Sequence, residues 1–100
     1  MLIFDWDEGN TKHAIVDYPE RQNTIRSVES IFDDPNFSAR IGKLIDGEQR
    51  YIGLGKDLNE IIKIVVFVIT EDKIRPISCW KAKEKVKKIY YEKEESRNKE

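Results

Sequence analysis

The sequence predicts an α+β protein with one antiparallel sheet of about four strands, two helices before the sheet and one helix after it. Short apolar, β-branched stretches follow one another between residues 37 and 80, separated by tight turns, as expected for antiparallel neighbours. Apolar residues recur at helical spacing on both sides of this region. At 100 residues the chain fits a single domain, 1–100.

The N-terminal third predicts one short strand and two helices. The apolar segment LIFDW, residues 2–6, has the composition of a strand. Asp7 offers an N-cap side chain for a helix over 7–16. A second helix is expected from Thr24. Its apolar face consists of Ile25, Val28, Ile31 and Phe32.

The strands are expected at residues 37–45, 49–56, 61–70 and 73–80. Asp46-Gly47 is a two-residue hairpin signal between the first two strands. The segment 61–70 is almost entirely apolar, which is typical of a central strand covered on both faces. Pro76 lacks a backbone donor and predicts an edge strand or a bulge. We expect the helices to pack on one face of the sheet and to leave the other face partly open.

Charge is distributed unevenly along the chain. Residues 1–72 carry a formal charge of −6, residues 73–91 carry +6, and residues 92–100 carry −1. The basic stretch coincides with an amphipathic helix expected from Lys81, followed by a polar tail at 92–100 that is predicted to fray. The lysines form either a solvated helix face or a surface for a polyanion.

Other classes are disfavoured by the composition. No apolar run reaches the 18 or so residues that span a membrane, and the acidic N-terminus differs from a signal peptide. The single cysteine, Cys79, has no partner for a disulfide or a zinc site. These features predict a cytoplasmic protein without a metal or other cofactor.

Four blocks in order carry a resemblance to a known family: FDWDEGN at the start, VESIFDDP, RYIGLG, and KIRPISCWKAKEKVKKIYYE near the end. The sequence resembles the BrnT family over almost the entire chain. The resemblance implies a RelE-like fold and a toxin of a type II toxin–antitoxin system, an endoribonuclease that cleaves RNA without a metal and inhibits translation. It also implies a BrnA-type antitoxin with a ribbon-helix-helix DNA-binding part, through which alone the toxin would contact operator DNA.

Metal-independent RNA cleavage needs a base for the 2′-hydroxyl, cations for the charge on the phosphorane, and an acid for the 5′-oxygen. RelE-like enzymes use Arg and Lys for much of this work. Arg50 is the first candidate for phosphate binding, with an ion pair to Glu48 or Asp57 as the structural alternative. Arg75 is the second candidate. If their strands face the same open surface, both arginines reach one phosphate.

The remaining catalytic candidates are Lys81, which would neutralise phosphate or leaving group, and His13, the single histidine, as acid or base. Lys12 is a weaker candidate than His13, and Cys79 lacks a histidine partner for thiol chemistry. The predicted RNA-binding residues are Lys83, Lys85, Lys88 and Trp80. Trp80 either stacks on a base or fills the edge of the core.

Two other functions remain open. Asp17-Tyr18-Pro19 stands where family members usually carry Lys-His-Gly, and Trp80 stands at an expected arginine position. The chain would then be a catalytically inactive binding module of the same fold, acting through protein or RNA contacts. The other alternative is an unrelated small α+β interaction domain.

Overall fold

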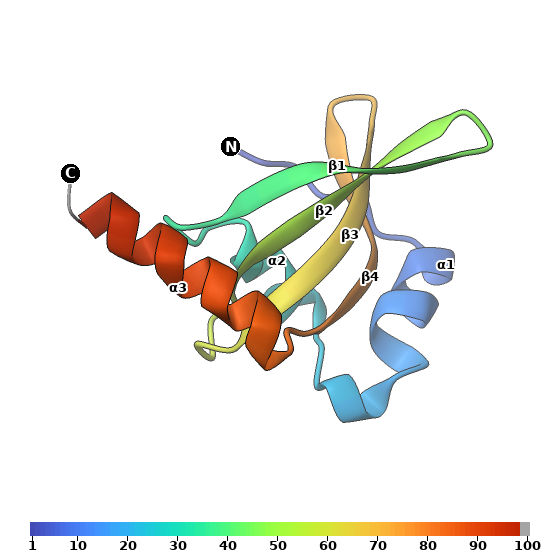
Figure 1. The fold of residues 1–100 in the computed structure, drawn as a ribbon. Helices are drawn as coiled ribbons and strands as arrows, with labels where there is room; N and C mark the ends of the chain where they lie inside the picture. The colour runs from blue at the N-terminus through green and yellow to red at the C-terminus, as the bar shows by residue number, and fades with distance from the viewer. Residues whose placement is uncertain (99–100) are drawn as a thin grey trace.

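The computed structural model describes residues 1–98 and contains a four-stranded antiparallel sheet in the order β1-β2-β3-β4 (Figure 1). The strands are β1 (Ser38–Ile45), β2 (Glu48–Lys56), β3 (Ile62–Thr70) and β4 (Lys73–Lys81). Each boundary lies within one residue of the predicted strand. The α+β prediction is confirmed, and β3 is the central strand that its apolar sequence indicates.

The helices are α1 (Glu8–Thr11), α2 (Ile25–Ile31) and α3 (Glu84–Asn98). A π-helical segment, Lys12–Val16, continues α1, and a single 3₁₀ turn, Pro19–Arg21, precedes α2. Asp7 caps α1 as predicted, since its side chain accepts a hydrogen bond from the backbone N–H of Asn10 at 3.2 Å. Thr24 caps α2 in the same way.

The predicted strand at 2–6 is wrong. Residues 3–5 instead make one isolated parallel bridge, Phe4 with Ile74, along the outer edge of β4. The N–H of Asp5 donates to the carbonyl of Ile74, and the N–H of Ile74 donates to the carbonyl of Ile3, both at 2.8 Å. The N-cap at Asp7 ends the extended segment before a longer ladder forms.

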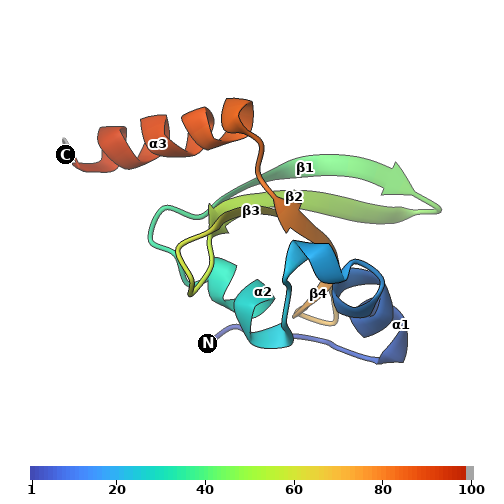
Figure 2. The same cartoon turned by 90° about the horizontal axis from the view of Figure 1, so that it is seen from below.

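The helices do not share one face of the sheet, contrary to the prediction. Figure 2 shows α1 and α2 on one side and α3 on the other. The last helix also begins at Glu84 rather than Lys81, because Lys81 still pairs with Lys63 and the N–H of Ala82 donates to the carbonyl of Ile62 at 2.9 Å. The apolar residues of β3 alternate between both faces, so both faces need a cover.

The larger core lies between the sheet and α2. Its buried members are Val28, Ile31, Val65, Phe67 and Cys79. Gly53 and Gly55 of β2 permit this close packing: a Cβ at Gly53 would lie 2.7 Å from the ring of Phe37, and one at Gly55 would lie 3.0 Å from the carbonyl of Ile31. Both glycines are therefore steric requirements of the α2 side.

A second core lies under α3, where Tyr90 is buried against Ile62 and Ala82. The Tyr90 hydroxyl donates to Asp34 Oδ2 at 2.6 Å, and the N–H of Lys56 donates to the same oxygen at 2.7 Å. Asp34, in the loop after α2, therefore connects that loop to both α3 and β2 by hydrogen bonds.

The helix extends through most of the segment that was predicted to fray. It is described to Asn98, and Arg97 Nη1 donates to the carbonyl of Pro35 at 3.1 Å. Glu94 lies 3.8 Å from Lys56 Nζ. These contacts hold the polar end of α3 beside the loop before β1, whereas residues 99–100 lie outside the described residues.

Stability is expected to depend on Asp34 at acidic pH. Desolvation opposes ionisation of this carboxyl, but its hydrogen bonds from Lys56, Tyr90 and Asn36 outweigh that effect and hold its pKa below the usual value. The stabilisation is present above the unfolded-state pKa of about 4 and is lost as the pH falls through the lower folded-state pKa. Asp34→Asn is expected to lower the free energy of unfolding by about 1–2 kcal/mol at pH 7 and to flatten its decline below pH 4, as measured by urea titration. An unchanged acid profile would contradict this role.

A buried polar network joins the chain before α2 to the sheet. Lys63 Nζ lies 2.8 Å from Asp57 Oδ2, with both side chains fully buried, and donates to Asn23 Oδ1 at 2.9 Å. Asn23 Nδ2 in turn donates to the carbonyls of Cys79 at 2.8 Å and Ala14 at 3.2 Å. The network fixes the segment between α1 and α2 against β4.

Candidate functional site

The two predicted arginines lie on one face of the sheet. Val68 of β3 pairs with Arg75 of β4. In the pairing of β3 with its other neighbour, β2, Phe67 pairs with Tyr51, so Arg50 of β2 lies directly across from Val68. Directly paired residues point to the same face, so Arg50 and Arg75 flank Val68 in one cross-strand row. We call these three residues the arginine row. The strands β2 and β4 lie about 10 Å apart across β3, within reach of two arginine side chains.

The arginine row lies on the α3 side of the sheet but beyond the end that α3 covers. Figure 2 shows α3 over one end of this face, while the rest carries no helix. Val68 is only 1% exposed, between the two arginines. The row therefore lies on a part of this face that carries no helix.

Arg50 has no ion pair among residues 1–98. Its Nε is buried and has no hydrogen-bond partner. Neither of the two carboxylates expected as alternative ion-pair partners binds Arg50. Asp57 forms an ion pair with Lys63, and Glu48 makes no ion pair with Arg50. A partly buried, unpartnered guanidinium is a ready anion-binding group.

Arg75 is paired with two carboxylates. Its Nη1 lies 2.9 Å from Asp7 Oδ2 and 3.6 Å from Asp5 Oδ2, and its Nη2 donates to Asp7 Oδ1 at 3.0 Å. The hydrogen bond that Arg75 donates to Asp7 raises the pKa of Arg75 and lowers the pKa of Asp7. Asp7 thus occupies Arg75 with the same fork geometry that a phosphate would use.

Removing this competing charge is expected to strengthen anion binding. Asp7→Asn keeps an efficient N-cap residue for α1 and removes the negative charge beside Arg75. The dissociation constant for a single-stranded RNA oligonucleotide is expected to fall by about two- to fivefold, the range of an exposed ion pair. Fluorescence anisotropy at low salt measures it. Asp17→Asn, which removes the exposed partner of Lys12, is the control, and equal effects of the two variants would contradict the prediction.

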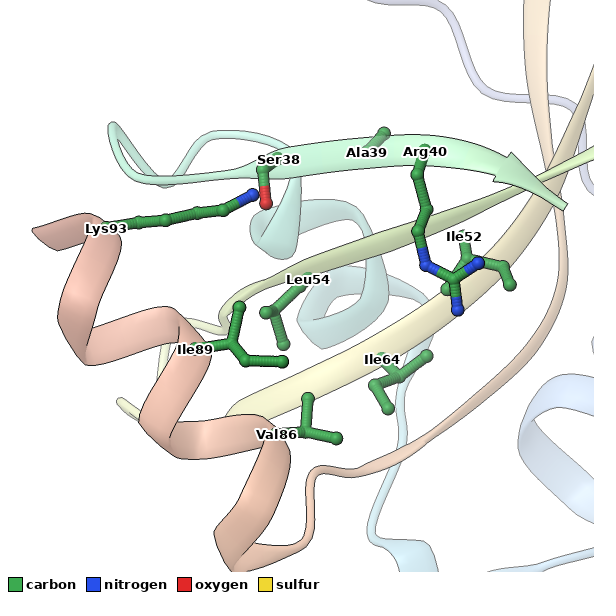
Figure 3. A pocket seen from close by; sticks show the side chains of 9 residues that line it. All are labelled: Ser38, Ala39, Arg40, Ile52, Leu54, Ile64, Val86, Ile89 and Lys93. Carbon is green, nitrogen blue, oxygen red and sulfur yellow. The ribbon is translucent and has the colours of Figure 1, made fainter.

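A cleft lies between α3 and the sheet, on the same face as the arginine row. It has a volume of about 230 Å³, and Figure 3 shows α3 side chains facing sheet residues across it. Ile52, Leu54 and Ile64 form its floor, and Arg40 lies at the rim. Arg40 pairs with Ile52, so it shares the face of Arg50. Sequence reasoning missed Arg40, although the alternation of β1 against β2 would have indicated its face.

The lysines lie apart from the arginine row. Lys81 pairs with Lys63, whose side chain points to the α2 side, and Lys81 Nζ donates to Gln22 Oε1 at 2.8 Å. Lys83 precedes α3, and Lys85 and Lys88 are exposed on it. Within the described residues, these three lysines have no ion pair.

His13 and Trp80 lie near the outer edge of β4, linked by two residues that sequence reasoning missed. The His13 ring meets the Tyr18 ring edge to face at 5.8 Å. The Arg21 guanidinium carbon lies 3.8 Å from the centre of the Tyr18 ring and 5.8 Å from that of Trp80. Trp80 pairs with Ile64 and is half-buried. Within residues 1–98, no hydrogen bond joins His13 to Arg50 or Arg75.

The single thiol is inaccessible, and residues 1–98 offer no cluster of three metal-ligand side chains. Cys79 is fully buried, and burial raises the pKa of its thiol to about 12. Residues 1–98 contain no group of three or more His, Cys, Asp or Glu side chains able to hold a metal ion. No helix among the described residues is long and apolar enough to span a membrane.

A family model matches most of the chain. The model of the family described as the ribonuclease toxin BrnT of type II toxin–antitoxin systems matches residues 6–85. No curated protein matches the sequence. The matched range contains α1, α2, the complete sheet and the arginine row. The chain therefore belongs to the BrnT family of ribonuclease toxins of type II toxin–antitoxin systems.

Proposed function

We propose that this toxin is a metal-independent endoribonuclease of RelE-like type, which cleaves RNA at the arginine row and thereby inhibits translation. The observation that carries the proposal is the row itself. Arg50 and Arg75 flank Val68 on one open face of the sheet, and Arg50 has a buried Nε without a partner. A phosphate between two guanidinium groups is the expected ligand of such a row.

The arginines would stabilise the negative charge that grows on the phosphorane as the 2′-hydroxyl attacks. Arg50 holds the phosphate in the ground state and the transition state, and Arg75 joins it after exchanging Asp7 for a phosphate oxygen. His13, whose ring contacts Tyr18, would serve as acid or base once RNA occupies the site. Lys12 and Lys81 are secondary candidates for a proton donor or cation.

The RNA would continue from the arginine row along β4 toward the start of α3. Trp80 offers a half-buried ring for stacking, and the exposed Lys83, Lys85 and Lys88 neutralise further phosphates. The toxin would act in the cytoplasm, where RNA is available. A cognate antitoxin of the BrnA type would neutralise it and provide the ribbon-helix-helix contacts to operator DNA.

Incubation of purified protein with a labelled single-stranded RNA tests the proposed chemistry. Cleavage is expected to continue in excess EDTA and to leave a 2′,3′-cyclic phosphate and a 5′-hydroxyl, because the 2′-hydroxyl is the nucleophile. The same RNA with 2′-deoxyribose at the cleaved position should resist. RNA binding without cleavage, with or without ribosomes, would instead identify an inactive binding module, and loss of cleavage in EDTA would exclude the metal-independent reaction.

A further inference from the structure

We propose that Arg21 binds the RNA phosphate next to the one held at the arginine row, with Tyr18 as the stacking platform that orients its guanidinium. The inference rests on the proposed ribonuclease function and adds a substrate-binding residue to the same site. It assigns a role to the turn between α1 and α2, whose sequence DYPERQN contains no recognised motif.

The position of Arg21 is fixed by neutral groups. Its guanidinium carbon lies 3.8 Å from the centre of the Tyr18 ring, within cation–π distance. Its Nη1 donates to Ser78 Oγ at 3.4 Å and to the carbonyl of Cys79 at 3.3 Å. The backbone beneath it is held by Asn23, which donates to the same carbonyl at 2.8 Å. The guanidinium is therefore oriented at the edge of β4 before any ligand binds.

The charge of Arg21 is uncompensated, unlike that of Arg75. Among residues 1–98, Arg21 has no ion pair, and Nη1 is the one guanidinium nitrogen that makes a hydrogen bond. Nη2 and Nε keep their donors, and a phosphate needs such a pair of donors from one guanidinium. Half-buried arginines held by neutral partners attract anions more strongly than arginines already paired with a carboxylate.

The spacing along β4 matches a neighbouring nucleotide. Ser78, which Arg21 contacts, pairs with Val66, whereas Arg75 pairs with Val68. Their partners Val66 and Val68 are two residues apart on β3, because β4 has a bulge between Arg75 and Ser78. Two residues along a strand span about 7 Å, which is comparable with the step between successive phosphates of an extended nucleic-acid strand. Directly paired residues share a face, so Ser78 lies on the same side of the sheet as the arginine row. One RNA strand can therefore contact both.

The test is binding of a 2′-O-methylated single-stranded oligonucleotide, which cannot be cleaved, over a range of salt concentrations. Arg21→Gln is expected to raise the dissociation constant about tenfold and to reduce the slope of log Kd against log salt by about 0.7, as for one lost phosphate contact. Arg21→Lys should keep the slope and weaken binding less. Arg26→Gln removes an exposed arginine of α2, on the opposite side of the sheet, and should change neither value.

Tyr18→Leu provides an independent variant that retains the charge of Arg21. It should weaken binding with an unchanged salt slope, because the platform is lost and the phosphate contact is not. If Arg21→Gln is fully folded by circular dichroism and binds as the wild type does, the role of Arg21 is disproved while the ribonuclease function stands. If the wild-type protein binds no RNA, both proposals are disproved. If Arg21→Gln does not fold, the binding of Arg21→Lys and Tyr18→Leu tests the proposal instead. RNA binding equal to that of the wild type in both variants would disprove the role of Arg21.

Discussion

Arg50→Ala is expected to lower kcat for RNA cleavage by about 10²- to 10³-fold, the loss seen when one donor that stabilises transition-state charge is removed. The effect on folding should be small, because Arg50 has no ion pair and its Nε has no partner to leave unsatisfied. Initial cleavage rates under saturating RNA, together with thermal unfolding by circular dichroism, measure both quantities.

Two further variants sharpen this prediction. Arg50→Lys keeps the charge without the planar fork, so it should recover only part of the lost rate. Arg26→Ala removes an exposed arginine of α2 on the opposite side of the sheet and should leave kcat within about twofold. Equal rates for Arg50→Ala and Arg26→Ala would exclude Arg50 from the reaction.

Lys63→Met is expected to lower the free energy of unfolding by about 3–5 kcal/mol, because it leaves Asp57 as an unpaired buried charge. Asp57 Oδ1 still accepts hydrogen bonds from the N–H groups of Asn59 at 2.9 Å and Ile61 at 3.0 Å, which tie its carboxyl to the turn before β3. Asn23 Oδ1 would also lose the hydrogen bond that Lys63 Nζ donates to it. Urea denaturation at pH 7 measures the change.

The matched control is Lys56→Met, which removes a partly exposed lysine 3.8 Å from Glu94. It should cost about 1 kcal/mol or less, since exposed ion pairs contribute little. The double variant Lys63→Met, Asp57→Asn should recover part of the stability lost in Lys63→Met, because the unpaired charge is gone. A loss below 1 kcal/mol in Lys63→Met would show that the buried pair is not required.

The strands were predictable because their pattern is local. Asp46-Gly47 forms the expected turn, with positive φ angles of 48° and 78° at the two residues. Pro76 lies both on an edge strand and at the bulge opposite Val66 and Phe67. The helix over 7–16 was also recovered, although its second half is π-helical.

Other features depended on contacts between distant residues. The side of the sheet that α3 covers is set at Ala82, where one backbone hydrogen bond to Ile62 continues β4 before the chain turns. The helical spacing of Ala82, Val86, Ile89 and Tyr90 predicted a helix from Lys81, because the pairing of Lys81 with Lys63 is not visible in the pattern.

The candidate site was predicted in part. Alternation and register bring Arg50 and Arg75 together, as expected if their strands share a face. The pairing of Arg75 with Asp5 and Asp7 was missed, since 68 residues separate Asp7 from Arg75 in the chain. Arg21 was missed because its environment is formed by Tyr18 and the distant Ser78.

The most direct test of the arginine row is a double-mutant cycle on kcat/KM for RNA cleavage with Arg50→Ala and Arg75→Ala. If both arginines bind one phosphate, the combined loss should be at least about fivefold smaller than the product of the single losses, a coupling of about 1 kcal/mol. Repeating the cycle with Asp7→Asn in every variant removes the carboxylate that Arg75→Ala would leave unpaired. A shared phosphate site would be contradicted if the double variant lost kcat/KM by the full product of the two single losses, both with Asp7 and with Asp7→Asn. It would also be contradicted if both single variants cleaved RNA at the wild-type rate.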